Sequence, residues 1–260
     1  MTETSSLALL DRHDISRFIF HPRSDPQPAS GAALYPVSVD QGVQVVCRFF
    51  PAGKDGSIIL YFHGNGETAG DYEHVAALYT GRGINLFVAD YRGYGLSNGS
   101  PSFSHMLSDA HHVFNAFVAL CKEEGYVGAR YVMGRSLGSA PAIEVAARHQ
   151  ESLHGMIIES GFSDALRLLR YIGAPLHMGE DFTRGFPNGM RISEIAIPTL
   201  IIHAEEDNLI PLAEAHELHR GAAAVDKRLV VIPHADHNNL LMIGRDRYFR
   251  AVQEFISSTL

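Results

Sequence analysis

Residues 134–138 read Gly-Arg-Ser-Leu-Gly and place Ser136 between two glycines. The apolar segment Tyr131–Met133 comes directly before this pentapeptide, and the helix-like segment Ala140–Arg148 follows it. A sharp turn from strand to helix strains the serine backbone and exposes the hydroxyl, and the glycines leave room for that turn. With 24 glycines in the chain, the five-residue pattern alone is weak. Its place between strand and helix favours a nucleophile over an ordinary glycine-flanked turn.

A serine hydroxyl becomes a strong nucleophile only when a base takes its proton and an acid fixes the tautomer of that base. Where such an elbow is used, an acid and then a histidine follow it, each in a loop after a strand. The segment Thr199–His203 is followed by Glu205, Glu206 and Asp207. We expect Asp207 to be the acid, because it lies far enough along the loop to reach the base. The two glutamates are alternatives that are better interpreted as solvated loop carboxylates.

The base is expected in the loop after Arg228–Ile232, which contains His234 and His237. His237 lies deeper in this loop and just before the final helix, so we favour it, and His234 stays open as the alternative. The chain has 15 histidines, and most of them must be ordinary surface or packing residues.

Acyl transfer also needs two backbone N–H groups aimed at the developing negative charge. One should belong to Leu137, the residue after the nucleophile. The loop at residues 63–67, His-Gly-Asn-Gly-Glu, follows the apolar segment Ser57–Phe62, and we expect the Asn65 N–H to be the second donor. A plain glycine-rich turn is the alternative. The chain has no GxxxxGK[ST] motif, so nucleotide binding is not expected.

Short apolar segments that recur along the chain are expected to form strands. The central ones are apolar on both faces, as in a parallel sheet covered by helices. Asp40-Gln41-Gly42 suits a hairpin between the first two segments, and apolar residues at helical spacing predict a helix over Phe103–Glu124, ended at Gly125. The predicted strands are Ala33–Val39, Val43–Phe50, Ser57–Phe62, Ile84–Ala89, Arg130–Met133, Gly155–Ile158, Thr199–His203 and Arg228–Ile232.

Two further segments belong to the same edge of the predicted sheet. Residues 161–197 are irregular and rich in glycine and proline, which indicates a small lid or, equally, a crossover that covers the sheet. In this segment Phe162 and Leu166 are expected to line an acyl pocket, together with Leu169, Ile172 and Phe182. After Ile84–Ala89, we expect Asp90 and Arg92 to form a hydrogen-bonded brace under the loops.

Length and composition favour one domain over residues 1–260. The net charge of −8 disfavours nucleic acid and anionic membranes as partners, which leaves a small-molecule acyl substrate. Cys47 and Cys121 suggest neither a disulfide framework nor a metal site, and no cofactor is expected. The sequence shows no secretion signal or transmembrane segment, so a cytoplasmic location is expected. Residues 1–30 match no pattern, and oligomeric state is not indicated.

Four blocks of the chain resemble the α/β-hydrolase superfamily, and in particular its Bem46-like proteins and abhydrolase-domain esterases and thioesterases. These blocks are residues 61–66, 90–95 and 134–139 and the loops that carry Asp207 and His237. The resemblance implies an α/β-hydrolase fold, with a mostly parallel eight-stranded sheet, helices on both faces and a small lid. It also implies a triad of Ser136, Asp207 and His237.

In the same way, the resemblance implies an oxyanion hole at Asn65 and Leu137. Depalmitoylases of the group have a lipidated, cysteine-rich N-terminus, whereas residues 1–30 contain no cysteine, so membrane-bound depalmitoylation is not implied. Ser136 disfavours the branches that use an aspartate nucleophile.

The expected function is hydrolysis of a carboxylic ester or thioester through an acyl-enzyme, as in carboxylesterases and thioesterases. Cleavage of an amide by the same machinery is the enzymatic alternative. A non-catalytic, hydrolase-like binding protein is the second alternative.

Overall fold

Eight strands form one sheet within residues 3–25, 32–176 and 188–259, the part of the chain that the computed structural model describes. They are β1 (Ala33–Asp40), β2 (Val43–Phe50), β3 (Ile58–Phe62), β4 (Asn85–Ala89), β5 (Arg130–Arg135), β6 (Gly155–Glu159), β7 (Thr199–Ala204) and β8 (Lys227–Ile232). The spatial order is β1-β2-β4-β3-β5-β6-β7-β8. Only β2 runs against its neighbours, and the pairs from β4 to β8 are parallel. The predicted mostly parallel, eight-stranded sheet is confirmed.

The hairpin at the start of the sheet follows from its turn residues. Gly42 has a φ of 72°, a left-handed conformation that glycine adopts at no steric cost. The inner strands β3, β4, β6 and β7 are buried along their whole length, because helical crossovers cover both faces.

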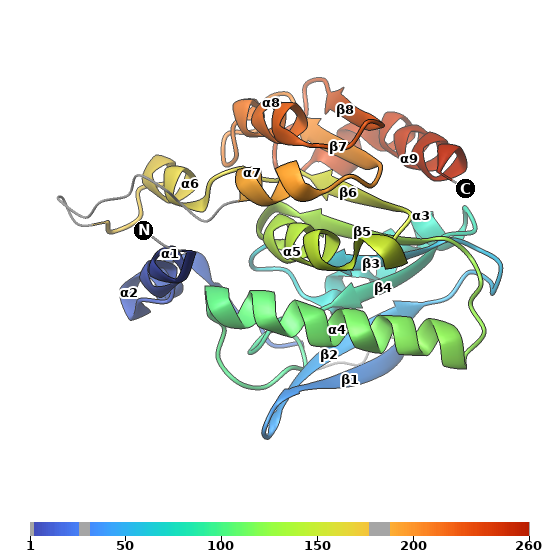
Figure 1. Cartoon of the computed structure of the whole chain (residues 1–260), viewed down its shortest axis with the longest axis horizontal. Helices are drawn as coiled ribbons and strands as arrows, with labels where there is room; N and C mark the ends of the chain where they lie inside the picture. The colour runs from blue at the N-terminus through green and yellow to red at the C-terminus, as the bar shows by residue number, and fades with distance from the viewer. Residues whose placement is uncertain (1–2, 26–31, 177–187, 260) are drawn as a thin grey trace.

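The helices form two layers around the sheet (Figure 1). On one face, α3 and α9 pack together through Tyr79 and Phe249, whose ring centroids are 5.0 Å apart. The other face is covered by α4, α5 and α8, with α1, α2 and α6 nearby. The helices are α1 (Glu3–Leu10), α2 (His13–Ile19), α3 (Glu73–Thr80), α4 (Phe103–Glu123), α5 (Ser139–His149), α6 (Ala165–Tyr171), α7 (Asn188–Arg191), α8 (Leu212–Gly221) and α9 (Leu240–Ser258).

The long helix α4 agrees closely with the prediction from spacing. Its first turn is capped by Ser102, whose Oγ accepts a hydrogen bond from the His105 N–H at 3.2 Å. Its apolar stripe, which includes Phe114 and Phe117, is buried against the sheet. No described helix is long and apolar enough to cross a membrane.

The predicted lid is described only in part. Residues 161–176 and 188–197 contain α6, α7 and a short 3₁₀ turn at Ile192–Glu194. Phe182 and the rest of residues 177–187 lie outside the described residues. Since parallel strands place their carboxyl ends at one edge, the loops after β3, β5, β6, β7 and β8 meet there, where α/β sheets bind ligands.

Candidate active site

Ser136 occupies a strained turn between β5 and α5. Its φ is 53°, in the left-handed region that non-glycine residues rarely adopt, and this conformation is typical of a nucleophile elbow. Gly138 is required by close packing, because a Cβ at that position would lie 2.1 Å from the Phe62 carbonyl oxygen. Ser139 steadies the turn by donating a hydrogen bond from Oγ to the Ser136 carbonyl at 2.7 Å.

The structure brings Ser136, His237 and Asp207 into one hydrogen-bonded chain. His237 Nε2 lies 3.0 Å from Ser136 Oγ, and His237 Nδ1 lies 2.7 Å from Asp207 Oδ2. Burial acts to raise the pKa of Asp207, but the hydrogen bond from His237 and the electrostatic attraction between the two side chains lower it below its ordinary value. An ionised carboxylate only accepts hydrogen bonds, so His237 Nδ1 carries the proton and Nε2 is free to accept from the serine hydroxyl.

The loop that carries Asp207 is fixed by its own backbone and by a second histidine. Asp207 Oδ1 accepts hydrogen bonds from the Leu209 N–H at 3.0 Å and from the Ile210 N–H at 2.8 Å. His203 Nε2 lies 2.8 Å from the Ile210 carbonyl oxygen and 3.6 Å from Asp207 Oδ2. Burial lowers the pKa of His203, which keeps this imidazole neutral beside the carboxylate. No motif in the sequence indicated this role for His203.

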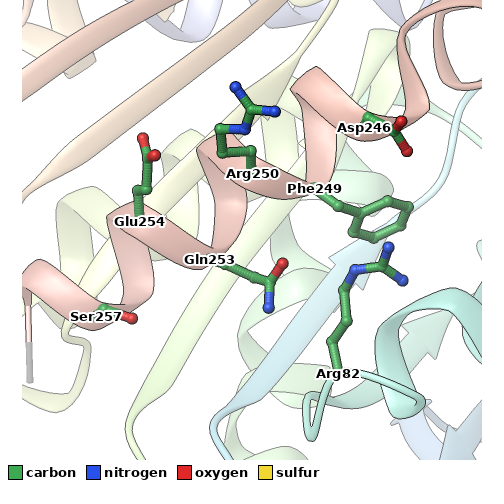
Figure 2. Close-up of a pocket in the computed structure, with 7 residues that line it drawn as sticks. All are labelled: Arg82, Asp246, Phe249, Arg250, Gln253, Glu254 and Ser257. Atoms are coloured by element: carbon green, nitrogen blue, oxygen red, sulfur yellow. The ribbon is translucent and has the colours of Figure 1, made fainter.

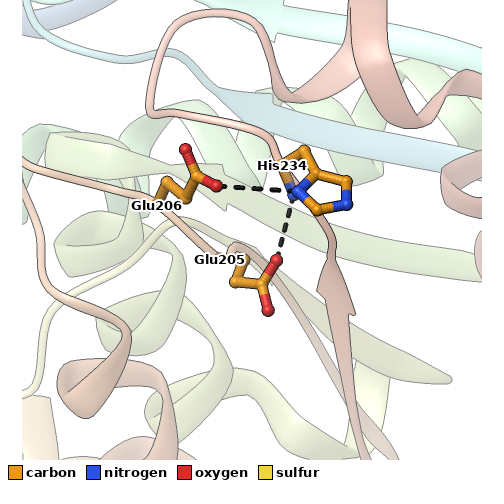
Figure 3. A group of neighbouring side chains, drawn as sticks. All are labelled: Glu205, Glu206 and His234. Atoms are coloured by element: carbon orange, nitrogen blue, oxygen red, sulfur yellow. Dashed lines mark hydrogen bonds and ion pairs between the residues drawn. The ribbon is translucent and has the colours of Figure 1, made fainter.

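The alternative acids and base form a separate surface cluster (Figure 3). The His234 N–H donates to Glu205 Oε2 at 3.0 Å, and His234 Nδ1 lies 3.6 Å from Glu206 Oε1. All three side chains are exposed. None of them forms a hydrogen bond or ion pair with Ser136 or His237, so the geometry selects Asp207 and His237.

Two backbone N–H groups near Ser136, one in the elbow and one in the loop after β3, have no described hydrogen-bond partner. Leu137 lies in the first turn of the 3₁₀ segment Ser136–Gly138, where an N–H has no partner within the helix. The Asn65 N–H makes no hydrogen bond to any described residue. Both Asn65 and Leu137 line the cavity that contains Ser136 and His237.

This cavity, of about 640 Å³, is mostly apolar and lies over the triad. Phe162 lines it as expected, whereas Leu166 is buried and is not among its lining residues. Leu166 packs into the core away from the cavity, and its neighbours Ala165, Leu168 and Leu169 on α6 line the cavity instead. The other apolar lining side chains are Phe18, Ile19, Phe103, Ile172, Leu209 and Ile210.

The N-terminal segment, which matched no pattern in the sequence, supplies one wall of this cavity. Arg17, Phe18 and His21 line it. Asn65 fastens the segment, since its Nδ2 donates to the Ile19 carbonyl and its Oδ1 accepts from the His21 N–H at 3.0 Å. No sequence signal identified this contact, because it joins residues 44 or more positions apart.

A second hollow, of about 430 Å³, lies on the outer side of α9 (Figure 2). Arg82 extends toward Phe249 there, and its guanidinium carbon lies 4.3 Å from the ring centroid. Ser257 is its only hydroxyl residue, and none of its lining residues is a histidine. This hollow therefore has no activated nucleophile.

The expected brace between Asp90 and Arg92 is wrong, because each side chain has a different partner. Asp90 Oδ1 lies 3.1 Å from His63 Nε2 and accepts from the Ala69 N–H at 2.8 Å. Arg92 donates to both carboxylate oxygens of Asp109 on α4, at 2.7 and 2.8 Å. Asp90 thus supports the loop after β3, and Arg92 anchors its own turn to α4.

The model of the Hydrolase_4 family, described as serine aminopeptidase, S33, matches residues 53–172 and 176–241, which is most of the chain. The chain belongs to this family. It is thus a member of the α/β-hydrolase superfamily, as its sequence blocks suggest.

Curated relatives extend this result. The human Alpha/beta hydrolase domain-containing protein 17B is 28% identical over 226 residues, covering 85% of this chain and 73% of the relative. The uncharacterized protein YfhR of Escherichia coli is 26% identical over 259 residues, covering 94% and 87%.

Solved structures agree in fold. The Pyrococcus furiosus esterase Pf2001 gives a TM-score of 0.73 at 17% identity, covering 92% of this chain and 98% of that one. A soluble variant of the monoglyceride lipase of Saccharomyces cerevisiae gives 0.70 at 16% identity, covering 90% and 98%. At these identities the likeness concerns the fold.

Proposed function

We propose that this protein is a serine hydrolase that cleaves a carboxylic ester or thioester through an acyl-enzyme. The observation that carries the proposal is the hydrogen-bonded chain from Asp207 through His237 to Ser136, at the base of an apolar cavity. Ser136 Oγ attacks the carbonyl carbon while His237 Nε2 takes its proton, and Asp207 stabilises the imidazolium that forms.

The N–H groups of Leu137 and Asn65 then stabilise the negative charge that develops on the carbonyl oxygen by donating hydrogen bonds to it. His237 gives its proton to the departing alcohol or thiol, which leaves an acyl group on Ser136. Water activated by the same imidazole attacks the acyl carbon, releases the acid and restores the serine. The apolar side chains above Ser136, among them Phe162, suit an acyl chain.

An aminopeptidase, as in the description of the family, needs a negative group that binds a free amino terminus. Among the described residues that line the cavity, Glu67 is the only acidic side chain. It is paired with Arg135 and is therefore not free to bind an ammonium group. This pairing favours an ester or thioester over a substrate with a free amine.

The test is labelling with a fluorophosphonate, which reacts with an activated serine, followed by mass measurement of the intact protein. Wild type should gain one adduct that Ser136→Ala loses. Ser257→Ala is the matched control, since Ser257 is exposed on α9, and it should keep the adduct.

Substrate panels then separate the chemistries. Esters and thioesters should turn over faster than aminoacyl amides of the same acyl group. Folded wild type that gains no adduct would refute the proposal and favour a hydrolase-like binding protein. Faster turnover of the amides would contradict the proposed ester or thioester substrate and indicate a peptidase.

A further inference from the structure

The side chain of Arg135, the residue before the nucleophile, contacts three other segments of the active-site edge. Its Nη1 forms an ion pair with Glu67 Oε1 in the loop after β3. Its Nε donates to Glu159 Oε1 at the end of β6, at 3.1 Å. Its Nη2 donates to the carbonyl oxygen of His237 at 2.8 Å. One planar guanidinium thus joins the elbow to the loops on both sides of it.

Glu67 extends this connection to the oxyanion loop. Its Oε2 accepts hydrogen bonds from the Gly64 N–H at 2.8 Å and from the Tyr72 hydroxyl at 2.7 Å. Gly64 is the residue directly before Asn65, so the carboxylate fixes the peptide that precedes the proposed oxyanion donor. The packing is tight, because a Cβ at Gly64 would lie 2.6 Å from Arg135 Nη1.

The charges of this pair also suit the reaction. A lone carboxylate beside the oxyanion loop would repel the negative charge that forms on the substrate carbonyl. Arg135 offsets that charge: burial acts to raise the pKa of Glu67, but the guanidinium brings it below its ordinary value. The carboxylate can therefore stay ionised and hold Gly64 without opposing the transition state.

We propose that Arg135 and Glu67 are a positioning pair. They hold the loop that contains Asn65 and the loop that contains His237 in the correct position relative to Ser136. This inference rests on the proposed function, because it concerns the alignment of the same nucleophile. Neither side chain takes part in bond making. Their loss should lower kcat and leave KM nearly unchanged, since the groups that they align act mainly on the transition state.

The principal variants are Arg135→Lys and Glu67→Gln. A lysine keeps the charge but cannot reach Glu67, Glu159 and the His237 carbonyl together. Both variants should lower kcat about 100-fold, the order of the effect of misplacing a catalytic group by about 1 Å, with KM within about threefold of wild type. Arg228→Lys is the matched control, because Arg228 pairs with Asp226 away from the cavity, and it should keep wild-type kcat.

A third variant perturbs the fold less than these two, so it tests the pair even if the principal variants fail to fold. Tyr72→Phe removes only the hydroxyl that donates to Glu67 Oε2, and it should lower kcat about threefold to tenfold, as for a hydrogen bond of about 1 kcal/mol. Wild-type kcat in all three active-site variants would overturn the inference. So would a rise in KM at constant kcat, which would make the pair a substrate-binding site.

Amide hydrogen exchange provides a readout that does not need turnover. Peptides that cover residues 63–67 and 234–239 should exchange faster in Arg135→Lys and Glu67→Gln than in wild type or Arg228→Lys. If wild type cleaves no ester but the variants still show faster exchange, the proposed function fails and the positioning pair stands. Unchanged exchange with unchanged kcat would refute the pair alone.

Discussion

Replacement of Asp207 by asparagine is expected to reverse the tautomer of His237, the proposed base. Asp207 Oδ1 accepts two backbone hydrogen bonds, from Leu209 and Ile210. An asparagine oxygen would take this position, because the amide nitrogen cannot accept a hydrogen bond. The nitrogen must then face His237 Nδ1, which now lies 2.7 Å from Asp207 Oδ2. His237 Nδ1 would have to accept, so its proton would move to Nε2, facing Ser136.

A histidine with its proton on Nε2 cannot act as a base toward Ser136. In a Ser-His-Asp triad this change lowers kcat by about 10⁴, which corresponds to a barrier higher by about 5 kcal/mol. The fold should persist, because the backbone hydrogen bonds of the loop are retained. The expected result for Asp207→Asn is therefore a folded protein with nearly complete loss of ester hydrolysis.

The assay is steady-state hydrolysis of a p-nitrophenyl ester, with urea unfolding of the same samples. Glu206→Gln is the matched control, because Glu206 is exposed and lies one residue earlier in the same loop. It should keep wild-type kcat. If Asp207→Asn lost less than about tenfold in kcat while Glu206→Gln lost more, the assignment of the acid would be refuted.

Three other results are expected. The lowered pKa values of Asp207 and Glu67 mean that both carboxylates stabilise the fold above their unfolded pKa values of 3.8 and 4.5 and lose this contribution as pH falls below them; the urea concentration at the unfolding midpoint should therefore change little between about pH 7 and about pH 5.5 and fall at lower pH, less steeply in Glu67→Gln. Gly138→Ala should abolish fluorophosphonate labelling, because its Cβ would meet the Phe62 carbonyl; normal labelling and an unchanged melting temperature would contradict the packing argument. Arg17→Glu should slow hydrolysis of esters with an anionic acyl end about fivefold relative to neutral esters, since Arg17 is an exposed cation on the cavity wall; an equal effect on both esters would exclude a role for its charge.

The parts of the fold that the sequence predicts well are those determined by local pattern. Apolar segments such as Thr199–His203 and the stripe of α4 have a clear period, and burial reinforces that period. The residues of the proposed triad could be chosen for a similar reason, because chain order and loop position constrain them.

Contacts that depend on distant partners were not predictable in this way. Asp90 and Arg92 are two residues apart, which suggested a mutual brace, yet their partners lie 27 and 17 residues away. Arg135 is an unspecified position of the elbow pattern, so no motif indicated its role. Leu166 was expected at the cavity because it is apolar, but the direction in which α6 faces decides which of its apolar residues reach it.

Asn65 connects substrate access to catalytic alignment. Its side chain fastens the N-terminal wall, through Ile19 and His21, while its backbone N–H is the proposed oxyanion donor. Displacing the wall would therefore break the hydrogen bonds that hold the donor in place. Changes in the N-terminal segment should therefore reduce the rate of turnover as well as substrate binding, although none of its residues belongs to the proposed triad.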